Sequence, residues 1–419
     1  MTASSPSVLR TNRSYRHLWF ARIFTTTAFQ MLTVAISWQM YALTGDAFSL
    51  GLVGLVEFIP MLLLTLIAGQ VADRFERRKI VFICQIMECG VVALLVTASL
   101  GDWIQSYHIL IAAAVLGASR SFENPTTSAL VPDLVDRESL PQAAAWTASA
   151  SQTASIVGPS LGGLLLVFGP STVYLISIVA LLISAFLILT LKVSRIDHKK
   201  EAASMDSLLT GLRFVFKRKI ILGTISLDLF AVLLGGATAL LPIFSEDILR
   251  TGSWGLGLMR TAPAVGALLM SFVLARYSIQ NAIGKYLFSS LAVFGLSTIL
   301  FAVSTNLTLS LVALFFIGAS DVVSVVIRTT LVQLNTPHDM QGRVNAVNML
   351  FIGTSNQLGE FESGTMAGWF GAVNATIIGG FGTIAVAFLW MYMFPELRTL
   401  KTYYDNSPTI KEGLEGSGR

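Results

Sequence analysis

The chain has 419 residues, of which 54% are hydrophobic and only 12% are charged. A soluble domain of this length carries about 25% charged residues, so a soluble protein is excluded. The mean hydropathy of +0.70 and the apolar segments along the whole chain predict an all-α protein that crosses a lipid bilayer many times. The net charge of +4 does not indicate a nucleic-acid partner, because the basic residues cluster at the ends of the apolar segments.

Twelve apolar segments follow one another, each long enough to cross a bilayer as a helix. Nearly all lysines and arginines lie in the termini or in every second connector, which by the positive-inside rule predicts that both termini are cytoplasmic. The five exceptions are Arg22, Arg120, Arg250, Arg260 and Arg328. The predicted spans are residues 18–43, 47–70, 80–100, 108–127, 141–166, 172–191, 220–243, 255–275, 285–303, 308–333, 345–369 and 374–394.

The polar stretch 192–219 separates the spans into two sets of six. Its apolar residues between Met205 and Phe216 recur every three or four positions, which predicts an amphipathic helix on the inner membrane surface. Similar connectors around Pro132 and Pro337 indicate duplicated halves, an architecture typical of transporters. The predicted parts are a cytoplasmic N-terminus (1–17), a six-helix bundle (18–191), a cytoplasmic linker (192–219), a second six-helix bundle (220–394) and a cytoplasmic tail (395–419).

The connector after the second span contains the pattern G-x-x-x-D-R-x-x-R-R, formed by Gly69, Asp73, Arg74, Arg77 and Arg78. This pattern resembles the signature of the major facilitator superfamily of transporters, and the resemblance implies two pseudo-symmetric six-helix bundles. Glycine permits close helix approach, and Asp73 could pair with an arginine or a helix N-terminus. We therefore predict a conformational latch here. A basic cluster that only sets the topology is the alternative.

The fifth span carries small residues that are similar to the antiporter motif of the same superfamily. They are Gly158, Pro159, Gly162 and Gly163, with Ala154 in place of the first glycine. The motif favours export, although a face of small residues also serves simple helix packing. The segments Glu57–Pro60, Leu240–Ala267 and Leu358–Gly364 resemble the branch of enterobactin exporters and macrolide efflux proteins.

Ionisable side chains within the predicted spans cost about 2.5–3.5 kcal/mol each to insert, so each is a functional candidate. The resemblance implies that spans one, four, seven and ten line a central cavity. Candidate cavity residues are Arg22, Thr26, Gln30, Thr33, Ser37, Glu57, Arg120, Glu123, Asp321, Ser324 and Arg328. Arg120 and Glu123, three residues apart, could instead form a structural pair on one helix.

Four carboxylates are candidates for proton coupling. Asp228 comes first because no cation stands three or four residues away on its own helix, and Asp321 is a further candidate. Glu360 and Glu362 are also candidates, but they lie about 200° apart around a helix and cannot both face one space. Glu88 is expected to reach the interface or a loop cation. None of the four histidines falls near the middle of a span, so a carboxylate would have to carry the proton.

These features predict a secondary transporter that exports a siderophore-like or drug-like small molecule in exchange for protons by alternating access. We expect a monomer in the bilayer of a bacterial inner membrane, with no metal or cofactor and the proton motive force as energy source. An importer of siderophore or lipid-like cargo is the alternative. An integral-membrane enzyme is a further alternative, but the sequence lacks H-E-x-x-H, G-x-S-x-G and P-loop motifs.

Overall fold

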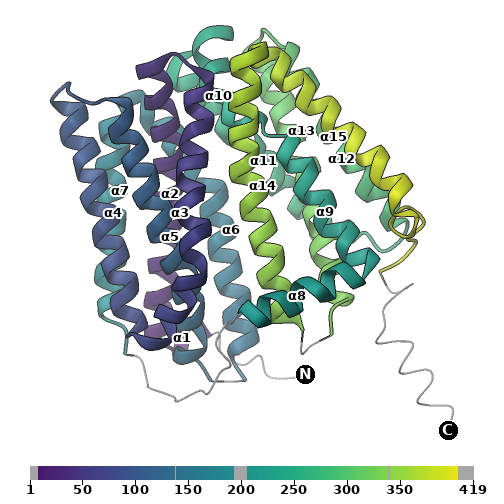
Figure 1. Cartoon of the computed structure of the whole chain (residues 1–419), viewed down its shortest axis with the longest axis horizontal. Helices are drawn as coiled ribbons and strands as arrows, with labels where there is room; N and C mark the ends of the chain where they lie inside the picture. The colour runs from purple at the N-terminus through teal and green to yellow at the C-terminus, as the bar shows by residue number, and fades with distance from the viewer. Residues whose placement is uncertain (1–7, 137, 193–204, 338–339, 404–419) are drawn as a thin grey trace. The chain divides into compact units, whose positions relative to one another are not determined.

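The computed structural model describes residues 8–136, 138–192, 205–337 and 340–403, and these residues form helices with no strand among them (Figure 1). Residues 404–419 of the predicted tail and residues 193–204 of the predicted linker lie outside the described residues. The helices of the first half are α1 (Val8–Thr11), α2 (Arg13–Thr44), α3 (Ala47–Arg74), α4 (Arg77–Leu100), α5 (Ser106–Leu134), α6 (Leu140–Leu165) with the 3-10 turn η1 (Leu166–Phe168), and α7 (Pro170–Leu189).

The second half begins with the predicted amphipathic helix, α8 (Met205–Lys217). Helix α9 (Lys219–Leu234) is followed by three short segments, η2 (Ala237–Leu240), α10 (Leu241–Ile243) and the π-helix η3 (Phe244–Ile248). The remaining helices are α11 (Gly252–Arg276), α12 (Ile283–Val303), α13 (Leu307–Leu334), α14 (Gln341–Phe370), α15 (Ala372–Met393) and α16 (Pro395–Arg398).

Nine helical segments in the described part of the chain are long and apolar enough to cross a membrane. Helices α2, α5 and α14 are not among them, although they contain 32, 29 and 30 residues. Each carries charged side chains, such as Arg22, Glu123 and Glu362, that lower its hydropathy. The count of twelve spans therefore stays a prediction, and the three more polar helices are those that supply many of the candidate site residues.

Local sequence signals fix several helix ends. The Asn12 side chain accepts a hydrogen bond from the Tyr15 amide at 2.9 Å and caps α2, which ends at Gly45 with a left-handed φ of 59°. Pro141 and Pro170 occupy first-turn positions of α6 and α7, where a missing amide hydrogen does no harm. These caps place most predicted helix boundaries within a few residues of the observed ones.

Two predicted boundaries are wrong. Helix α5 continues to Leu134, through Pro125 and Pro132, so the connector expected around Pro132 is helical. The span predicted at 220–243 is not one continuous helix, because α9 ends before Gly235 and Gly236. Glycine weakens a helix, and at Gly236 a side chain would lie 2.9 Å from the Gly359 carbonyl oxygen of α14.

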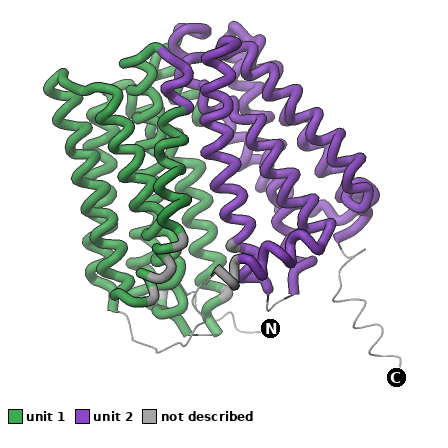
Figure 2. The backbone as a smooth tube through the Cα atoms, viewed as in Figure 1, with its two compact units in different colours: residues 1–45, 52–204, 251–261 green, residues 46–51, 205–250, 262–419 purple. Residues whose placement is uncertain are grey.

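The chain forms two compact units (Figure 2). Unit 1 contains residues 1–45, 52–204 and 251–261, and unit 2 contains residues 46–51, 205–250 and 262–419. In unit 1, α2 packs against α6 and α7, and α4 packs against α5 and α7. In unit 2, α12 packs against α13 and α15, and α14 packs against α9 and α15. The N-terminal and C-terminal parts of the chain thus supply most of units 1 and 2 respectively.

Each unit has its own apolar core with a few internal hydrogen bonds. In unit 1 the fully buried Tyr174 donates its hydroxyl to the Gln39 amide oxygen at 2.7 Å. In unit 2 the Trp390 indole donates to the Ser226 hydroxyl at 3.1 Å, within a cluster that includes Leu287 and Ile327. Buried polar groups of this kind are paired because lipid and apolar side chains offer no alternative partner.

The small residues of α6 permit close helix packing in unit 1. A β-carbon added at Gly162 would lie 2.9 Å from Met31 Cα of α2, and one added at Gly158 would lie 2.5 Å from the Gln30 β-carbon. Gly163 lies against Gly257, in the part of α11 that belongs to unit 1. The motif therefore has a packing role here.

We predict that Gly162→Ala lowers the free energy of unfolding by about 1–3 kcal/mol, because the new methyl group must push α2 and α6 apart. The measurement is thermal unfolding of the detergent-solubilised protein. Gly90→Ala is the control: a β-carbon there meets nothing within 4 Å, so helix propensity predicts a neutral or slightly stabilising effect. Equal melting temperatures for Gly162→Ala and the unmodified protein would contradict the packing role.

Candidate functional site

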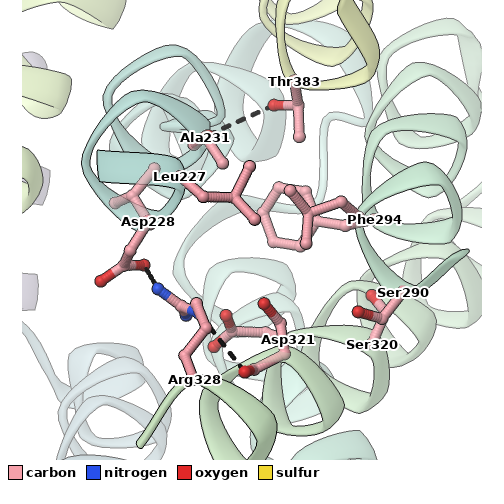
Figure 3. A pocket seen from close by; sticks show the side chains of 12 residues that line it. Leu227, Asp228, Ala231, Ser290, Phe294, Ser320, Asp321, Arg328 and Thr383 are labelled. Atoms are coloured by element: carbon pink, nitrogen blue, oxygen red, sulfur yellow. Dashed lines mark hydrogen bonds and ion pairs between the residues drawn. The ribbon is translucent and has the colours of Figure 1, made fainter. Parts of the chain in front are cut away.

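A small cavity inside unit 2 brings four of the predicted site residues together (Figure 3). Asp228 comes from α9, whereas Asp321, Ser324 and Arg328 come from α13. The cavity volume is about 20 Å³, enough for one water molecule. Its other lining residues, from α9, α12, α13 and α15, are Leu227, Ala231, Val232, Ser290, Leu291, Phe294, Ser320 and Thr383.

An ion pair joins the two sides of this cavity. The Asp228 carboxylate binds the Arg328 guanidinium, and both side chains are almost fully buried. Arg328 also donates from Nε to the Ser324 carbonyl oxygen at 3.3 Å. Arg328 follows Asp228 by one hundred residues in the sequence, so a search for partners three or four residues away does not find it. Asp228 is therefore not the isolated carboxylate that its own helix suggests.

Asp321 completes the cluster. It precedes Arg328 by seven residues, which is two helical turns, so the two side chains lie on the same face of α13. Asp321 is partly buried and forms no hydrogen bond or ion pair with another residue that the structure describes. With two carboxylates beside one guanidinium, the cluster is electrically neutral when one carboxylate holds a proton. The arrangement can therefore bind and release a proton without losing its ion pair.

Unit 1 holds a second group of polar side chains among α2, α4 and α5. Arg120 lies with its guanidinium 4.1 Å from the centre of the Phe29 ring and 4.0 Å from the Glu123 carboxylate. Arg22 donates from Nε to the Ser151 hydroxyl of α6 at 2.8 Å. The predicted pairing of Arg120 with Glu123 on one helix is thus present, as a long ion pair.

A family model described as "Transmembrane secretion effector" matches residues 3–411. The chain belongs to this family of major facilitator transporters. Among curated proteins, the enterobactin exporter EntS of Salmonella choleraesuis (strain SC-B67) is 24% identical over 409 residues, covering 94% of this chain and 95% of that protein. The EntS of Escherichia coli O1:K1 / APEC is 25% identical over 411 residues with the same coverage.

Solved transporter structures share the fold. A bacterial homologue of the human lysosomal transporter Spinster, in an inward-facing and occupied conformation, has a TM-score of 0.72 at 13% identity and covers 95% of this chain and 100% of that one. A bacterial homologue of the iron transporter ferroportin, in an inward-facing state, has a TM-score of 0.69 at 17% identity, with 94% and 100% covered. These structures confirm the predicted α-helical membrane fold. The family match and the EntS relatives confirm a secondary transporter of small molecules rather than an enzyme.

Sequence reasoning missed part of the unit 1 site of this transporter. Glu88 was expected at the membrane interface, but it lies in the middle of the 24-residue helix α4 and is only 1% exposed. Its Oε1 atom has no hydrogen-bond partner in the described structure. The expectation failed because α4 begins at Arg77, eleven residues before Glu88, so the Glu88 side chain lies far from the helix end. Gln85 and Glu88, three residues apart on an otherwise apolar helix, were the available signal.

Gln85 connects α4 to the rest of the unit 1 site. Its amide donates to the Glu123 carboxylate at 2.8 Å and contacts the hydroxyls of Thr25 and Ser184 at 3.0 and 2.9 Å. Glu123 Oε2 has no hydrogen bond in the described structure. Thr25 and Ser184 carry no distinctive sequence pattern, so only their positions in the folded transporter reveal them.

The remaining cavity candidates are dispersed. Thr33 and Ser37 donate their hydroxyls to carbonyl oxygens of their own helix, while Gln30 donates to the Ser155 carbonyl oxygen at 3.4 Å. Thr26 is partly buried on α2, and Glu57 is buried on α3. These hydrogen bonds of Gln30, Thr33 and Ser37 are therefore with backbone oxygens and not with Arg120 or Glu123.

Glu360 and Glu362 are both partly buried on α14 and do not line the unit 2 cavity. Glu362 accepts a hydrogen bond from the Ser363 hydroxyl at 3.5 Å. Of the four proton-coupling candidates, Asp228 and Asp321 line one cavity together with Arg328.

The predicted latch is described in part. The surroundings of Gly69 and of the Asp73 side chain are not among those that the structure describes. Arg74 is exposed at the end of α3. Arg77 binds the Asp133 carboxylate of α5 at 2.6 Å. Arg78 binds Glu76 at 2.7 Å and the Leu191 carbonyl oxygen at 3.0 Å. The arginines thus connect the N-terminus of α4 with the ends of α5 and α7, and the latch stays a prediction.

The Asp228–Arg328 pair predicts strong coupling in a double-mutant cycle. Either Asp228→Asn or Arg328→Gln leaves its partner buried without an ion-pair partner, whereas the double variant removes both charges. We expect the double variant to be more stable than the sum of the single losses predicts, by about 1–3 kcal/mol. Thermal or denaturant unfolding in detergent measures it.

The control is the same cycle on Glu76 and Arg78. Both side chains of this pair are substantially exposed, and hydrogen bonding to Lys79 and Arg78 already holds the pKa of Glu76 below its ordinary value. Water and salt screen such a pair, so no resolvable coupling is expected. Additive losses at Asp228 and Arg328 would contradict the importance of the buried pair.

Proposed function

We propose that this transporter exports a siderophore-like or drug-like small molecule in exchange for protons. The observation that carries the proposal is the buried unit 2 cluster, in which Asp228 pairs with Arg328 and Asp321 lines the same cavity without an ion-pair partner among the described residues. The enterobactin exporters that align over nearly the whole chain support the outward direction and the cargo class. Import of siderophore or lipid-like cargo is the competing direction.

The cluster performs proton exchange by electrostatics. With both carboxylates ionised it carries one net negative charge, which is costly to hold away from water. A proton on Asp321 makes the cluster neutral while Asp228 keeps its ion pair with Arg328. In alternating access, the neutral cluster would then face the cytoplasm, where the proton is released and the negative charge returns. The transporter can then bind cargo and change to its outward-facing conformation. Each charge that crosses the membrane field contributes about 2.3 kcal/mol per 100 mV.

The unit 1 site has the chemistry to contact cargo. Arg120 stacks on Phe29 and its carboxylate partner is 4.0 Å away, so its guanidinium retains donors for an acceptor-rich aromatic molecule. The Arg22 atom Nη1 has no hydrogen-bond partner in the described structure. We propose that unit 1 supplies cargo contacts and unit 2 supplies the proton site.

We further propose a monomer in the bilayer of a bacterial inner membrane, with both termini in the cytoplasm. The basic residues near the cytoplasmic helix ends support this orientation. The energy source would be the proton motive force, with no bound cofactor.

Asp321→Asn tests the proton site. In proteoliposomes with an imposed proton gradient, this variant is expected to lose gradient-driven cargo flux by at least about tenfold, since an amide cannot exchange the proton. Its cargo counterflow without a gradient should persist. The exposed Glu138→Gln is the matched control and should behave like the unmodified protein. Gradient-driven flux that survives in Asp321→Asn would refute the assignment of the proton site.

The cargo and direction are tested in cells of the natural host with and without the gene. Under iron limitation the deletion strain is expected to retain more siderophore inside and to release less into the medium, and plasmid expression should reverse both changes. Mass spectrometry of cells and medium measures the distribution. A deletion strain with less internal siderophore than its parent would instead establish import.

A further inference from the structure

A second, much larger cavity lies within unit 2, between α11, α12 and α13. Its volume is about 700 Å³, the size of a site for an organic ligand. Apolar and aromatic side chains form much of its wall, among them Val273 and Tyr277 of α11, Tyr286 and Val293 of α12, and Phe316 of α13. The lining contains no charged side chain.

The cavity opens on an apolar surface. Val273 is 49% exposed, Phe316 is 48% exposed, and Val293 and Tyr277 are also exposed. In a protein that crosses a bilayer, such a surface contacts lipid. The opening of this cavity is therefore accessible to the lipid phase.

The inner wall of the large cavity is shared with the charged cavity. Ser290 and Ser320 line the charged cavity (Figure 3) and also the large cavity. The Ser290 hydroxyl donates to the Leu287 carbonyl oxygen at 2.8 Å, and the Ser320 hydroxyl donates to the Phe316 carbonyl oxygen at 2.7 Å. Because their hydroxyls are satisfied within their own helices, these small residues present little bulk between an occupant of the large cavity and Asp321.

The end of the cavity between α11 and α12 is polar, because Ser278, Gln280 and Asn281 of the connector line it. Arg276 and Lys285 lie outside the lining itself, but they are exposed and are next in sequence to the lining residues Tyr277 and Tyr286. Neither forms an ion pair with another described residue.

The segment after α15 adds further positive charge at this end. The Gly284 amide donates to the Leu400 carbonyl oxygen at 3.1 Å, which brings the segment that carries Arg398 and Lys401 to the start of α12. The carboxylate of Glu396, in the same segment, lies 4.0 Å from Lys219. Among the described residues, the rim formed by Arg276, Lys285 and this segment therefore carries more positive than negative charge.

We propose that this cavity binds an anionic phospholipid, with an acyl chain inside it and the phosphate at Arg276 and Lys285. The apolar wall suits the chain, and the basic rim suits the head group. A free anion would make no contact with the apolar wall of the cavity. An uncharged amphiphile would gain no electrostatic attraction from the basic rim. The bound acyl chain packs against the wall that contains Ser290 and Ser320. It thereby stabilises the shape of the charged cavity on the other side of that wall. This proposal does not depend on proton coupling or on the direction of transport.

The test measures binding of phosphatidylglycerol to the purified full-length protein in detergent, by native mass spectrometry and by the shift in melting temperature. Phosphatidylcholine and glycerol 1-phosphate are the comparison probes. We expect phosphatidylglycerol to bind more tightly than phosphatidylcholine and glycerol 1-phosphate not to bind. Equal affinity for the two lipids would overturn the role of the rim, and binding of glycerol 1-phosphate as tight as that of the lipid would overturn the role of the cavity.

Two sets of variants separate the head-group and chain contacts. Arg276→Gln with Lys285→Gln should weaken phosphatidylglycerol about 10- to 30-fold and phosphatidylcholine by much less, because the choline cation already offsets the charge of the phosphate. Val293→Trp should fill the cavity and weaken both lipids. Ser289→Trp, at an exposed position of the same wall, is a second filling variant should the first fail to fold.

Val303→Trp is the matched control, because Val303 is exposed on α12 but lies outside the cavity. It should bind both lipids as the unmodified protein does. Unchanged lipid binding in folded Val293→Trp or Ser289→Trp would overturn the site, and so would a loss in Val303→Trp as large as theirs.

Discussion

A charge that lies away from water needs a partner, and the ion pair between Asp228 and Arg328 meets this need in unit 2. Without it, α9 and α13 would each carry an isolated charge among apolar side chains, at a cost of several kcal/mol. The pair joins the two helices and leaves Asp321 beside them as a carboxylate with no ion-pair partner among the described residues. The chemistry proposed for the transporter thus depends on one structural contact.

Unit 1 meets the same requirement in another way. Its charges are distributed over a long ion pair, a cation–π contact and hydrogen bonds from uncharged side chains, with Gln85 connecting Glu123 to its neighbours. Several contacts of this kind leave donors and acceptors unused, as at Arg22 and Glu88. Unused polar groups in a membrane protein suit a site that exchanges partners with a cargo. A tight pair suits a site that must keep its geometry while a proton moves.

The two cavities of unit 2 differ in size and therefore in what each can hold. The charged cavity has room for a water molecule, whereas the neighbouring cavity of about 700 Å³ has room for an acyl chain. Two small side chains, Ser290 and Ser320, line both cavities. A lipid-accessible space so close to a carboxylate offers a physical means by which the surrounding bilayer would influence the proposed proton site.

The sequence by itself determined the membrane class, the helical fold and most helix boundaries. The high hydropathy and the low charged fraction reflect the lipid that surrounds the protein, and they can be read from composition alone. Helix caps and glycines act over only a few residues, so they too can be read from the linear chain. Motifs such as Gly69 to Arg78 and Gly158 to Gly163 indicated the superfamily. The continuation of α5 through Pro132 and the interruption of α9 at Gly235 were not predicted, because packing against neighbouring helices decides whether a helix continues.

Only the tertiary structure decided which charges meet. Asp228 pairs with a residue one hundred positions away, and Glu88 is buried against helices that the sequence does not place beside it. Separation along the chain says little about distance in space once helices pack, because each contact depends on the rotation and crossing of two helices. The candidate residues could therefore be named from the cost of charge in lipid, but their partners could be found only in the fold.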